Sequence, residues 1–266
     1  MKIPDLFRLD GKVIVITGGT GLIGSEIVRE LPGFGANVVV GVRNTEKFKD
    51  LSDQIDIADK NLIPECYKLD VSIPQSIKEF FQKVEKKYGR IDVLINNAFP
   101  KTKDWSACFE DVKAESLFNN LCSHAGGYFL CCQEATRYMK KCNEGVILNV
   151  GSIYGTVGPH FPIYEKTPMT TPGAYALIKG GIHSFTKYLS TYLAPYNIRV
   201  NCLSPGGLLD ESLQYQPFIK NYKKNTPLGR MGEPKDLVGP MVFLISDASR
   251  YITGVVLHVD GGWTAW

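Results

Sequence analysis

The sequence has little that would tie the protein to a membrane or to nucleic acid. No apolar run approaches the ~18–20 residues that cross a bilayer. Residues 1–5 contain no apolar segment of the kind that signal peptides carry. Positive charge is also scarce, because the net charge is only +3 and the lysines and arginines are spread along the chain. We therefore expect neither a membrane nor a nucleic-acid partner, and we expect the protein in the cytoplasm.

Metal-binding and disulfide patterns are also missing. The chain has seven cysteines, an odd number, with no C-x-x-C, and its four histidines show no H-x-x-x-H spacing. Cys131 and Cys132 are adjacent, which is poor geometry for a mutual disulfide or a metal pair. We expect free thiols in a reducing compartment and no metal site.

Short β-branched runs alternate with longer amphipathic stretches along the whole chain. The expected strands are 12–17, 38–42, 66–70, 91–95, 146–150, 198–202 and 255–259. The expected helices lie near 22–31, 45–57, 74–88, 107–141 with a break, 173–194 and 234–246. This alternation predicts an α/β fold: one doubly wound parallel sheet of seven strands, with helices on both faces. We expect residues 1–266 to form a single domain.

Two stretches interrupt this rhythm. Residues 155–172 carry four prolines, and residues 207–229 are long, polar and aromatic. Each follows an expected strand at its carboxyl end, where ligands bind in such sheets. We therefore expect both to be substrate-side loops.

The first strand runs directly into a glycine-rich turn. The segment Thr17-Gly-Gly-Thr-Gly-Leu-Ile-Gly24 contains G-x-G-x-x-G at positions 19, 21 and 24, between a strand and a helix. Glycines permit the tight turn and let backbone N–H groups approach a pyrophosphate at the helix N-terminus. We predict dinucleotide binding, with candidate contacts at Gly18, Thr20, Gly21, Leu22, Ile23 and Gly24.

The end of the second strand bears on the choice of dinucleotide. An NAD-preferring site usually places an acidic residue there, to bind the adenosine ribose. Here the strand ends Gly41-Val-Arg43-Asn44, with no acid, and Arg43 could pair with a 2′-phosphate. We favour NADP(H) as the cofactor and keep NAD(H) open.

Tyr175 and Lys179 are four residues apart and so share one helix face. Their free pKa values, ~10 and ~10.4, make neither a ready proton carrier at neutral pH. An ammonium beside a phenol favours the phenolate and lowers the tyrosine pKa. Such a pair can move a proton on or off an alcohol oxygen, and Ser152 follows an apolar run upstream. The spacing alone also fits an ordinary helix.

With these motifs the chain resembles the short-chain dehydrogenase/reductase family over nearly its whole length, in the short single-domain Rossmann-fold branch. The matching motifs occur in the family's order: the glycine turn at 17–24, Asp70-Val71, Asn96-Asn97-Ala98, Ser152, Tyr175-x-x-x-Lys179, Pro205-Gly206, Ile252-Thr-Gly254 and Asp260-Gly-Gly262.

The resemblance implies roles for these residues. Asp70 and Val71 would contact the adenine, Asn97 and Ala98 the adenosine ribose, and Pro205 and Gly206 the nicotinamide. Lys179 would hold the nicotinamide ribose and lower the pKa of Tyr175. Ser152 would bind the substrate oxygen, while Tyr175 exchanges its proton as hydride moves to or from the carbon bearing that oxygen. The resemblance further implies a homo-oligomer, a tetramer or dimer, built through the helices at 107–141 and 173–194.

The chain departs from the family pattern at four positions. Leu22 stands where the family's short branch usually has its second glycine. The resulting G-x-x-G-x-x-G pattern from Gly18 resembles that of the family's longer, sugar-nucleotide-modifying branch. Phe99 replaces a glycine, and we expect it to narrow the cofactor cleft or to form a substrate wall. His124 stands at the position of a proton-relay asparagine, and Asn120 lies one turn earlier, so either could take that role. Asp210 replaces a threonine, which leaves the Leu208 backbone to contact the carboxamide.

The distance from Ser152 to Tyr175 is 23 residues, clearly more than is usual in the family. The surplus lies in 158–172, a proline-stiffened stretch that we expect to cover the mouth of the active site, or else to serve subunit contacts. It resembles short-chain enzymes of flagellin modification and surface-glycan synthesis. We therefore predict an NAD(P)-dependent oxidoreductase that acts on a sugar-like secondary alcohol or ketone, a small-molecule substrate. A hydride-borrowing epimerase or dehydratase, and a non-catalytic NADP-binding protein, remain alternatives.

Overall fold

One parallel sheet of seven strands organises the protein. A computed structural model describes residues 2–266, and within them the strands lie in the order β3-β2-β1-β4-β5-β6-β7. Their bounds are β1 Val13–Thr17, β2 Asn37–Val42, β3 Glu65–Lys68, β4 Val93–Asn96, β5 Gly145–Val150, β6 Ile198–Pro205 and β7 Val256–Val259. The order reverses beside β1, and this confirms the predicted doubly wound Rossmann fold.

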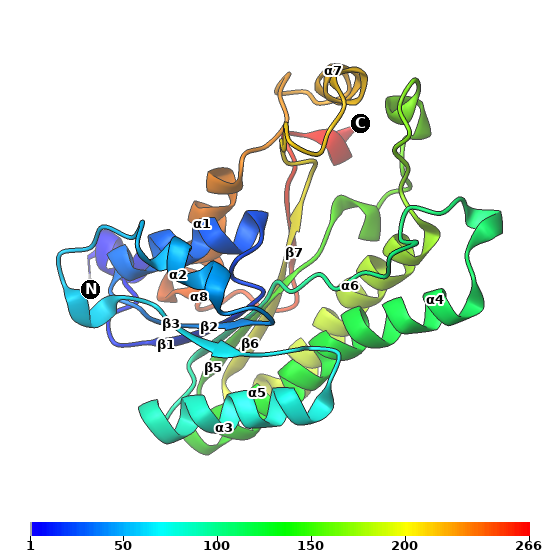
Figure 1. Ribbon diagram of the computed structural model, residues 1–266. Coiled ribbons are helices and arrows are strands. Elements are labelled where there is room, and N and C mark those ends of the chain that lie inside the picture. Colours follow the sequence, from blue (N-terminus) through cyan, green and yellow to red (C-terminus); the bar gives the residue numbers. More distant parts are fainter. Residues whose placement is uncertain (1) are drawn as a thin grey trace.

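Helices cover both faces of the sheet, as Figure 1 shows. One face carries α1 (Leu22–Glu30), α2 (Glu46–Ser52) and α8 (Val238–Ile245). The other carries α3 (Pro74–Tyr88), α5 (Gly127–Cys142) and α6 (Gly173–Leu193). Each face has its own buried apolar cluster. Because the strands are buried on both faces, their sequences are nearly continuous runs of hydrophobic residues.

The helix expected over 107–141 is interrupted, as predicted. After a 3-10 turn at Phe109–Asp111 come α4 (Ala114–Asn120) and a π-helical segment, Leu121–Gly126, which leads directly into α5. A π segment inserts an extra residue into the helical ladder, and such segments are frequent at functional sites. Here it contains the fully buried His124.

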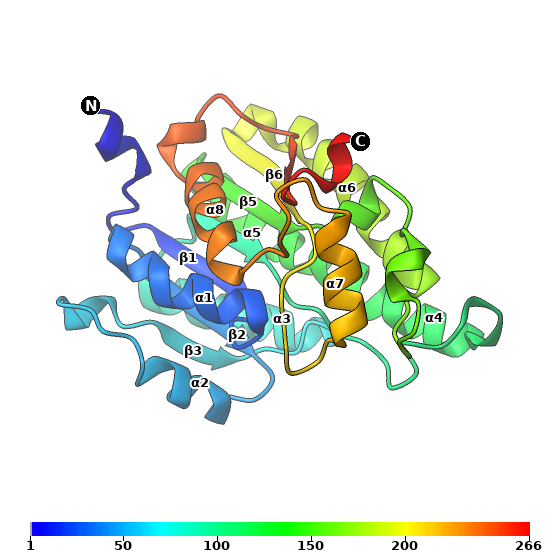
Figure 2. The same ribbon diagram turned by 90° about the horizontal axis from the view of Figure 1, so that it is seen from above.

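A small cap stands above the carboxyl ends of the strands. It consists of the 3-10 turn Phe161–Tyr164, helix α7 (Gln216–Lys224) and the C-terminal turn Trp263–Ala265. Figure 2 shows α7 and the C-terminus close together over this edge. Ile163, Phe218 and Trp263 are buried in a cluster separate from the main core. The expected loop at 207–229 thus contains a helix, and the loop at 155–172 packs against it.

Among residues 2–266, no helix combines the length and the apolar character needed to span a bilayer.

Candidate active site

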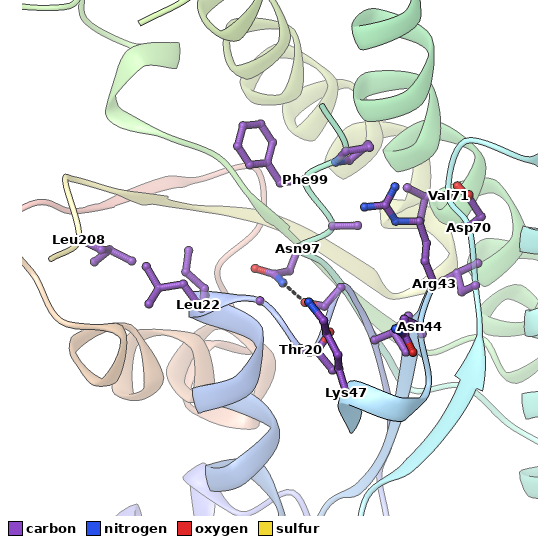
Figure 3. A pocket seen from close by; sticks show the side chains of 18 residues that line it. Thr20, Leu22, Arg43, Asn44, Lys47, Asp70, Val71, Asn97, Phe99 and Leu208 are labelled. Atoms are coloured by element: carbon purple, nitrogen blue, oxygen red, sulfur yellow. Dashed lines mark hydrogen bonds between the residues drawn. The ribbon is translucent and has the colours of Figure 1, made fainter. Parts of the chain in front are cut away.

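The glycine turn opens onto a pocket of about 770 Å³ at the carboxyl ends of β1, β2 and β4. Gly18 adopts φ +70°, and a Cβ there would lie 2.8 Å from Ala98 Cα. A Cβ on Gly24 would lie 2.4 Å from the Gly18 carbonyl oxygen. The Asn97 amide donates to that same oxygen at 3.0 Å (Figure 3). The turn therefore needs glycine and is fixed to the end of β4.

Most residues predicted to bind cofactor line this pocket. They are Gly18, Thr20, Gly21, Leu22, Ile23, Arg43, Asn44, Asp70, Val71, Asn97, Ala98 and Leu208. Gly24, Pro205, Gly206, Tyr175 and Lys179 are not part of its lining. Gly24 instead packs beneath the turn. The pocket thus has the place and the shape for the adenosine and pyrophosphate half of a dinucleotide.

Two cationic side chains lie at one side of the pocket. Arg43 and Lys47 are exposed there, next to Asn44 (Figure 3). Neither forms an ion pair within residues 2–266. Lys47, in the first turn of α2, was missed from the sequence, because its place beside Arg43 depends on how the segment after β2 folds back to the pocket. Leu22 and Leu208 lie on the opposite side (Figure 3).

Asp70 also has a structural role. Its Oδ1 accepts the Ser72 backbone N–H at 2.9 Å and the Ser72 hydroxyl at 2.6 Å. These bonds fix the turn that leads from β3 to α3. The carboxyl group nevertheless faces the pocket, beside Val71.

Ser152, Tyr175 and Lys179 come together just beyond the pocket. Ser152 follows β5 and is buried, and its Oγ accepts the Tyr154 N–H at 3.2 Å. Lys179 lies one turn after Tyr175 on α6 and is buried. Its ammonium donates to the Val150 carbonyl at 2.8 Å and lies 5.6 Å from the centre of the Tyr175 ring.

The pKa values correct one expectation. Burial raises the pKa of Tyr175 above its ordinary value, and the Ser152 hydroxyl opposes this only in part. Burial also lowers the pKa of Lys179 to about 8. The pKa of Tyr175 is therefore raised and not lowered in this structure, because desolvation dominates at the phenol while the Lys179 ammonium donates to the Val150 carbonyl.

Phe99 lies between the pocket and these residues. It lines the pocket, and its ring centre is 5.6 Å from that of Tyr175 and 5.0 Å from that of His124. Trp105 packs edge-on against both rings, with its centre 6.0 Å from that of Tyr175 and 5.4 Å from that of Phe99. Phe99 thus belongs both to the wall of the pocket and to the surroundings of Tyr175.

Comparison with known proteins identifies this arrangement. The sequence family described as "Enoyl-(Acyl carrier protein) reductase", one of the short-chain reductases, matches residues 20–264. The chain is 32% identical to the post-translational flagellin modification protein A of Campylobacter coli, over 96% of this chain and 99% of that protein. It belongs to the short-chain dehydrogenase/reductase family.

Solved short-chain dehydrogenase structures agree over nearly the full length. A short-chain dehydrogenase of Leptospira borgpetersenii with bound NAD+ is 39% identical, with a TM-score of 0.84, covering 99% of this chain and 96% of that one. A gluconate 5-dehydrogenase of Burkholderia cenocepacia, in complex with NADP and tartrate, is 29% identical, with a TM-score of 0.86 and 98% coverage of both chains. The protein is therefore a short-chain oxidoreductase that uses a nicotinamide cofactor.

Within the family pattern, the structure separates the two relay candidates. Asn120 is occupied: its Oδ1 accepts the Thr102 N–H at 3.0 Å, and its amide donates to the Thr102 hydroxyl and the Ser116 carbonyl, both at 2.9 Å. His124 is fully buried, and neither ring nitrogen has a hydrogen-bond partner among the described residues. Burial and the nearby Lys179 hold its pKa well below the usual range, so His124 is neutral.

The family resemblance assigns residues 205–208 to the nicotinamide side of the site. A Cβ on Gly206 would lie 2.8 Å from Asp260 Cα, so glycine is required there. The next N–H, that of Gly207, donates to the Tyr222 hydroxyl of α7 at 2.5 Å. The Leu208 carbonyl accepts the Gln214 amide at 2.8 Å. Helix α7 therefore fixes the turn that would face the nicotinamide.

Proposed function

We propose that this short-chain oxidoreductase is NADP(H)-linked and interconverts a secondary alcohol and a ketone on a sugar or a sugar-derived metabolite. The observation that carries the proposal is the grouping of Ser152, Tyr175 and Lys179 beside the dinucleotide pocket. When bound, the nicotinamide would supply or take up the hydride.

The roles of the protein residues follow from their placement. Ser152 Oγ hydrogen-bonds the reacting oxygen, and the Tyr175 hydroxyl holds the proton that this oxygen gains or loses. Lys179 uses one donor on Val150 and keeps two for the nicotinamide ribose hydroxyls. We propose the relay at His124, which is neutral and close to Lys179, rather than at Asn120, whose amide hydrogens are both already donated.

The sugar-like substrate is supported by two likenesses. One relative modifies flagellin, and one solved neighbour is a gluconate 5-dehydrogenase that holds tartrate, a small hydroxy acid. The matching family description points instead to acyl carrier protein substrates. A comparison of kcat/KM for sugars, sugar acids, simple secondary alcohols and 3-oxoacyl thioesters tests the proposal. Much better turnover of thioesters or simple alcohols than of sugars would refute it.

The NADP(H) preference is proposed from Arg43 and Lys47 and makes a testable prediction. Both cations line the pocket without ion-pair partners within residues 2–266, and β2 ends without an acid. Each charge-assisted bond to a 2′-phosphate contributes ~1.5–3 kcal/mol, or roughly 10- to 100-fold in affinity. We expect Arg43→Ala and Lys47→Ala each to weaken NADP+ binding by about that factor and to leave NAD+ binding within about twofold, as measured by fluorescence titration.

The matched control for this experiment is Lys49→Ala, which removes an exposed lysine of α2 that does not line the pocket. It should change neither affinity. Equal losses for both cofactors in the Arg43 and Lys47 variants would contradict the assignment of these cations to the 2′-phosphate.

We also propose a homotetramer in the cytoplasm. An exposed aromatic row lies across α5 and α6: Phe129 stacks on Phe185 at 5.3 Å, and Tyr188 stacks on Tyr192 at 5.9 Å. These helices are the ones that the family resemblance assigns to subunit contacts, and an exposed row of aromatic side chains favours association. Light scattering on the purified protein tests this proposal, because a monomer mass would refute it. The free cysteines fit a reducing compartment.

A further inference from the structure

Three hydroxyl groups form a continuous chain beside the catalytic tyrosine. The Tyr154 and Tyr164 hydroxyls lie 3.1 Å apart, and the Tyr164 hydroxyl also bonds that of Thr171. Tyr154 comes two residues after Ser152, and its ring meets that of Tyr175 edge-on, with centres 6.4 Å apart. Tyr164 and Thr171 belong to the long loop between Ser152 and Tyr175.

The hydrogen-bonding capacity of this chain is not exhausted. Three hydroxyls carry three donors and six acceptor lone pairs, and their two mutual bonds use two of each. One donor and four acceptors remain without any other protein partner in residues 2–266. All three side chains are half-buried, where unpaired polar atoms are costly. The three hydroxyls therefore keep hydrogen-bonding capacity for polar groups of a bound molecule.

The cap holds these hydroxyls in place. The Tyr164 ring stacks on Phe218 of α7, with centres 5.3 Å apart and planes at 23°. The neighbouring Ile163 is fully buried in the same cluster, which also contains Trp263. Four prolines stiffen the loop. Hydroxyls fixed in this way bind a ligand with little loss of side-chain entropy.

We propose that Tyr154, Tyr164 and Thr171 form a subsite that binds hydroxyl groups of the substrate next to the carbon that reacts at Tyr175. This inference rests on the proposed function and deepens it, because it assigns selectivity for polyhydroxylated substrates to the loop at 155–172. The remaining capacity is rich in acceptors, so it matches donors such as sugar hydroxyls. A carboxylate could use only the one remaining donor, and an acyl chain has no O–H or N–H to donate to the four acceptors. Burial raises the pKa of Tyr154, so its hydroxyl stays neutral at any working pH.

The test removes the hydroxyls without removing the packing. Tyr164→Phe keeps the ring on Phe218, and Thr171→Val keeps the shape of the side chain. Each lost neutral hydrogen bond should cost ~0.5–1.5 kcal/mol. We therefore expect kcat/KM for the best sugar substrate to fall about 3- to 10-fold in each variant, mainly through KM. For a secondary alcohol with a single hydroxyl, kcat/KM should stay within about twofold.

The matched control is Tyr251→Phe, which removes a hydroxyl from a fully exposed tyrosine outside both substrate-side loops. It should leave kcat/KM unchanged for both substrates. Equal losses of kcat/KM on both substrates, or a lowered Tm, would show that these hydroxyls have a structural role and would overturn the subsite. Unchanged kcat/KM for the sugar would also overturn it. A wild-type enzyme that turns over no sugar would refute the proposed function itself, which is a different result.

Discussion

Tyr175→Phe is expected to abolish turnover while leaving cofactor affinity nearly unchanged. The change removes one oxygen atom and keeps the ring, which packs against Phe99, Trp105 and Tyr154. In the proposed mechanism no other proton donor replaces it, because Ser152 would bind the substrate oxygen and the Lys179 ammonium donates to the Val150 carbonyl. Removal of a positioned acid–base group costs roughly 10²–10⁴-fold in rate. We expect kcat to fall by about 10³-fold or more, with Kd for the cofactor within about twofold.

The measurement is steady-state kinetics combined with fluorescence titration of the cofactor. Tyr251→Phe, which alters a fully exposed tyrosine in the turn before β7, serves as the matched control and should retain full activity. Activity of Tyr175→Phe within tenfold of the wild type would show that the proton comes from another group.

Lys179→Met is expected to lower both turnover and cofactor affinity while raising the stability of the protein. The ammonium is buried with one hydrogen bond, and its pKa is lowered from 10.5 to about 8. That shift corresponds to a penalty on the order of 3 kcal/mol for holding the charge in the fold. A methionine of similar length avoids the penalty. We expect Tm to rise by several degrees and kcat/KM to fall by about 10²-fold or more.

The pH dependence gives this prediction a sharper form. The folded-state pKa of Lys179, about 8, lies below the unfolded value, so the unfolded chain binds the extra proton more readily. The stability contributed by this group is therefore lowest below pH 8 and rises between about pH 8 and 10. Cofactor affinity, which uses the charged form, should fall as pH rises through about 8.

Lys179→Met should show neither of these changes with pH. If cofactor affinity fell equally steeply above pH 8 in the variant, another group would be responsible for the titration. Lys179→Arg is the control for the loss of charge, because it keeps a positive charge at this position. Its planar guanidinium group differs in shape from the lysine ammonium.

Much of the fold could be predicted from the sequence because its signals are local. Buried parallel strands appear as β-branched runs, and the glycine turn needs a fixed set of residues between a strand and a helix. The seven strands and the lining of the pocket therefore lie close to the predicted positions. A break within 107–141 was also predicted, although neither its position nor its π-helical form was.

The missed features depend on contacts between distant segments. Helix α7 has nine residues, and its buried side chains make sense only against Ile163 and Trp263. The direction of the Tyr175 pKa shift depends on burial, and on where the Lys179 ammonium points, neither of which the Y-x-x-x-K spacing reveals. The chain from Tyr154 to Thr171 joins residues whose proximity only the folded loop creates.

The alternatives to net oxidation and reduction differ in the fate of the hydride. An epimerase or dehydratase returns the hydride within each turnover, and a non-catalytic protein transfers none. Leu22, the departure that raised the first alternative, simply lines the pocket opposite Arg43 (Figure 3). It changes the wall of the site and leaves Ser152, Tyr175 and Lys179 in place.

The transfer of deuterium to the cofactor tests the central claim most directly. The best sugar substrate would be labelled with deuterium at the carbon that is oxidised, and the reduced cofactor would be examined by mass spectrometry after turnover with NADP+. The account predicts one deuterium in each reduced cofactor molecule, in equal amount to the ketone formed. Product formed without reduced cofactor, or reduced cofactor without the label, would contradict it.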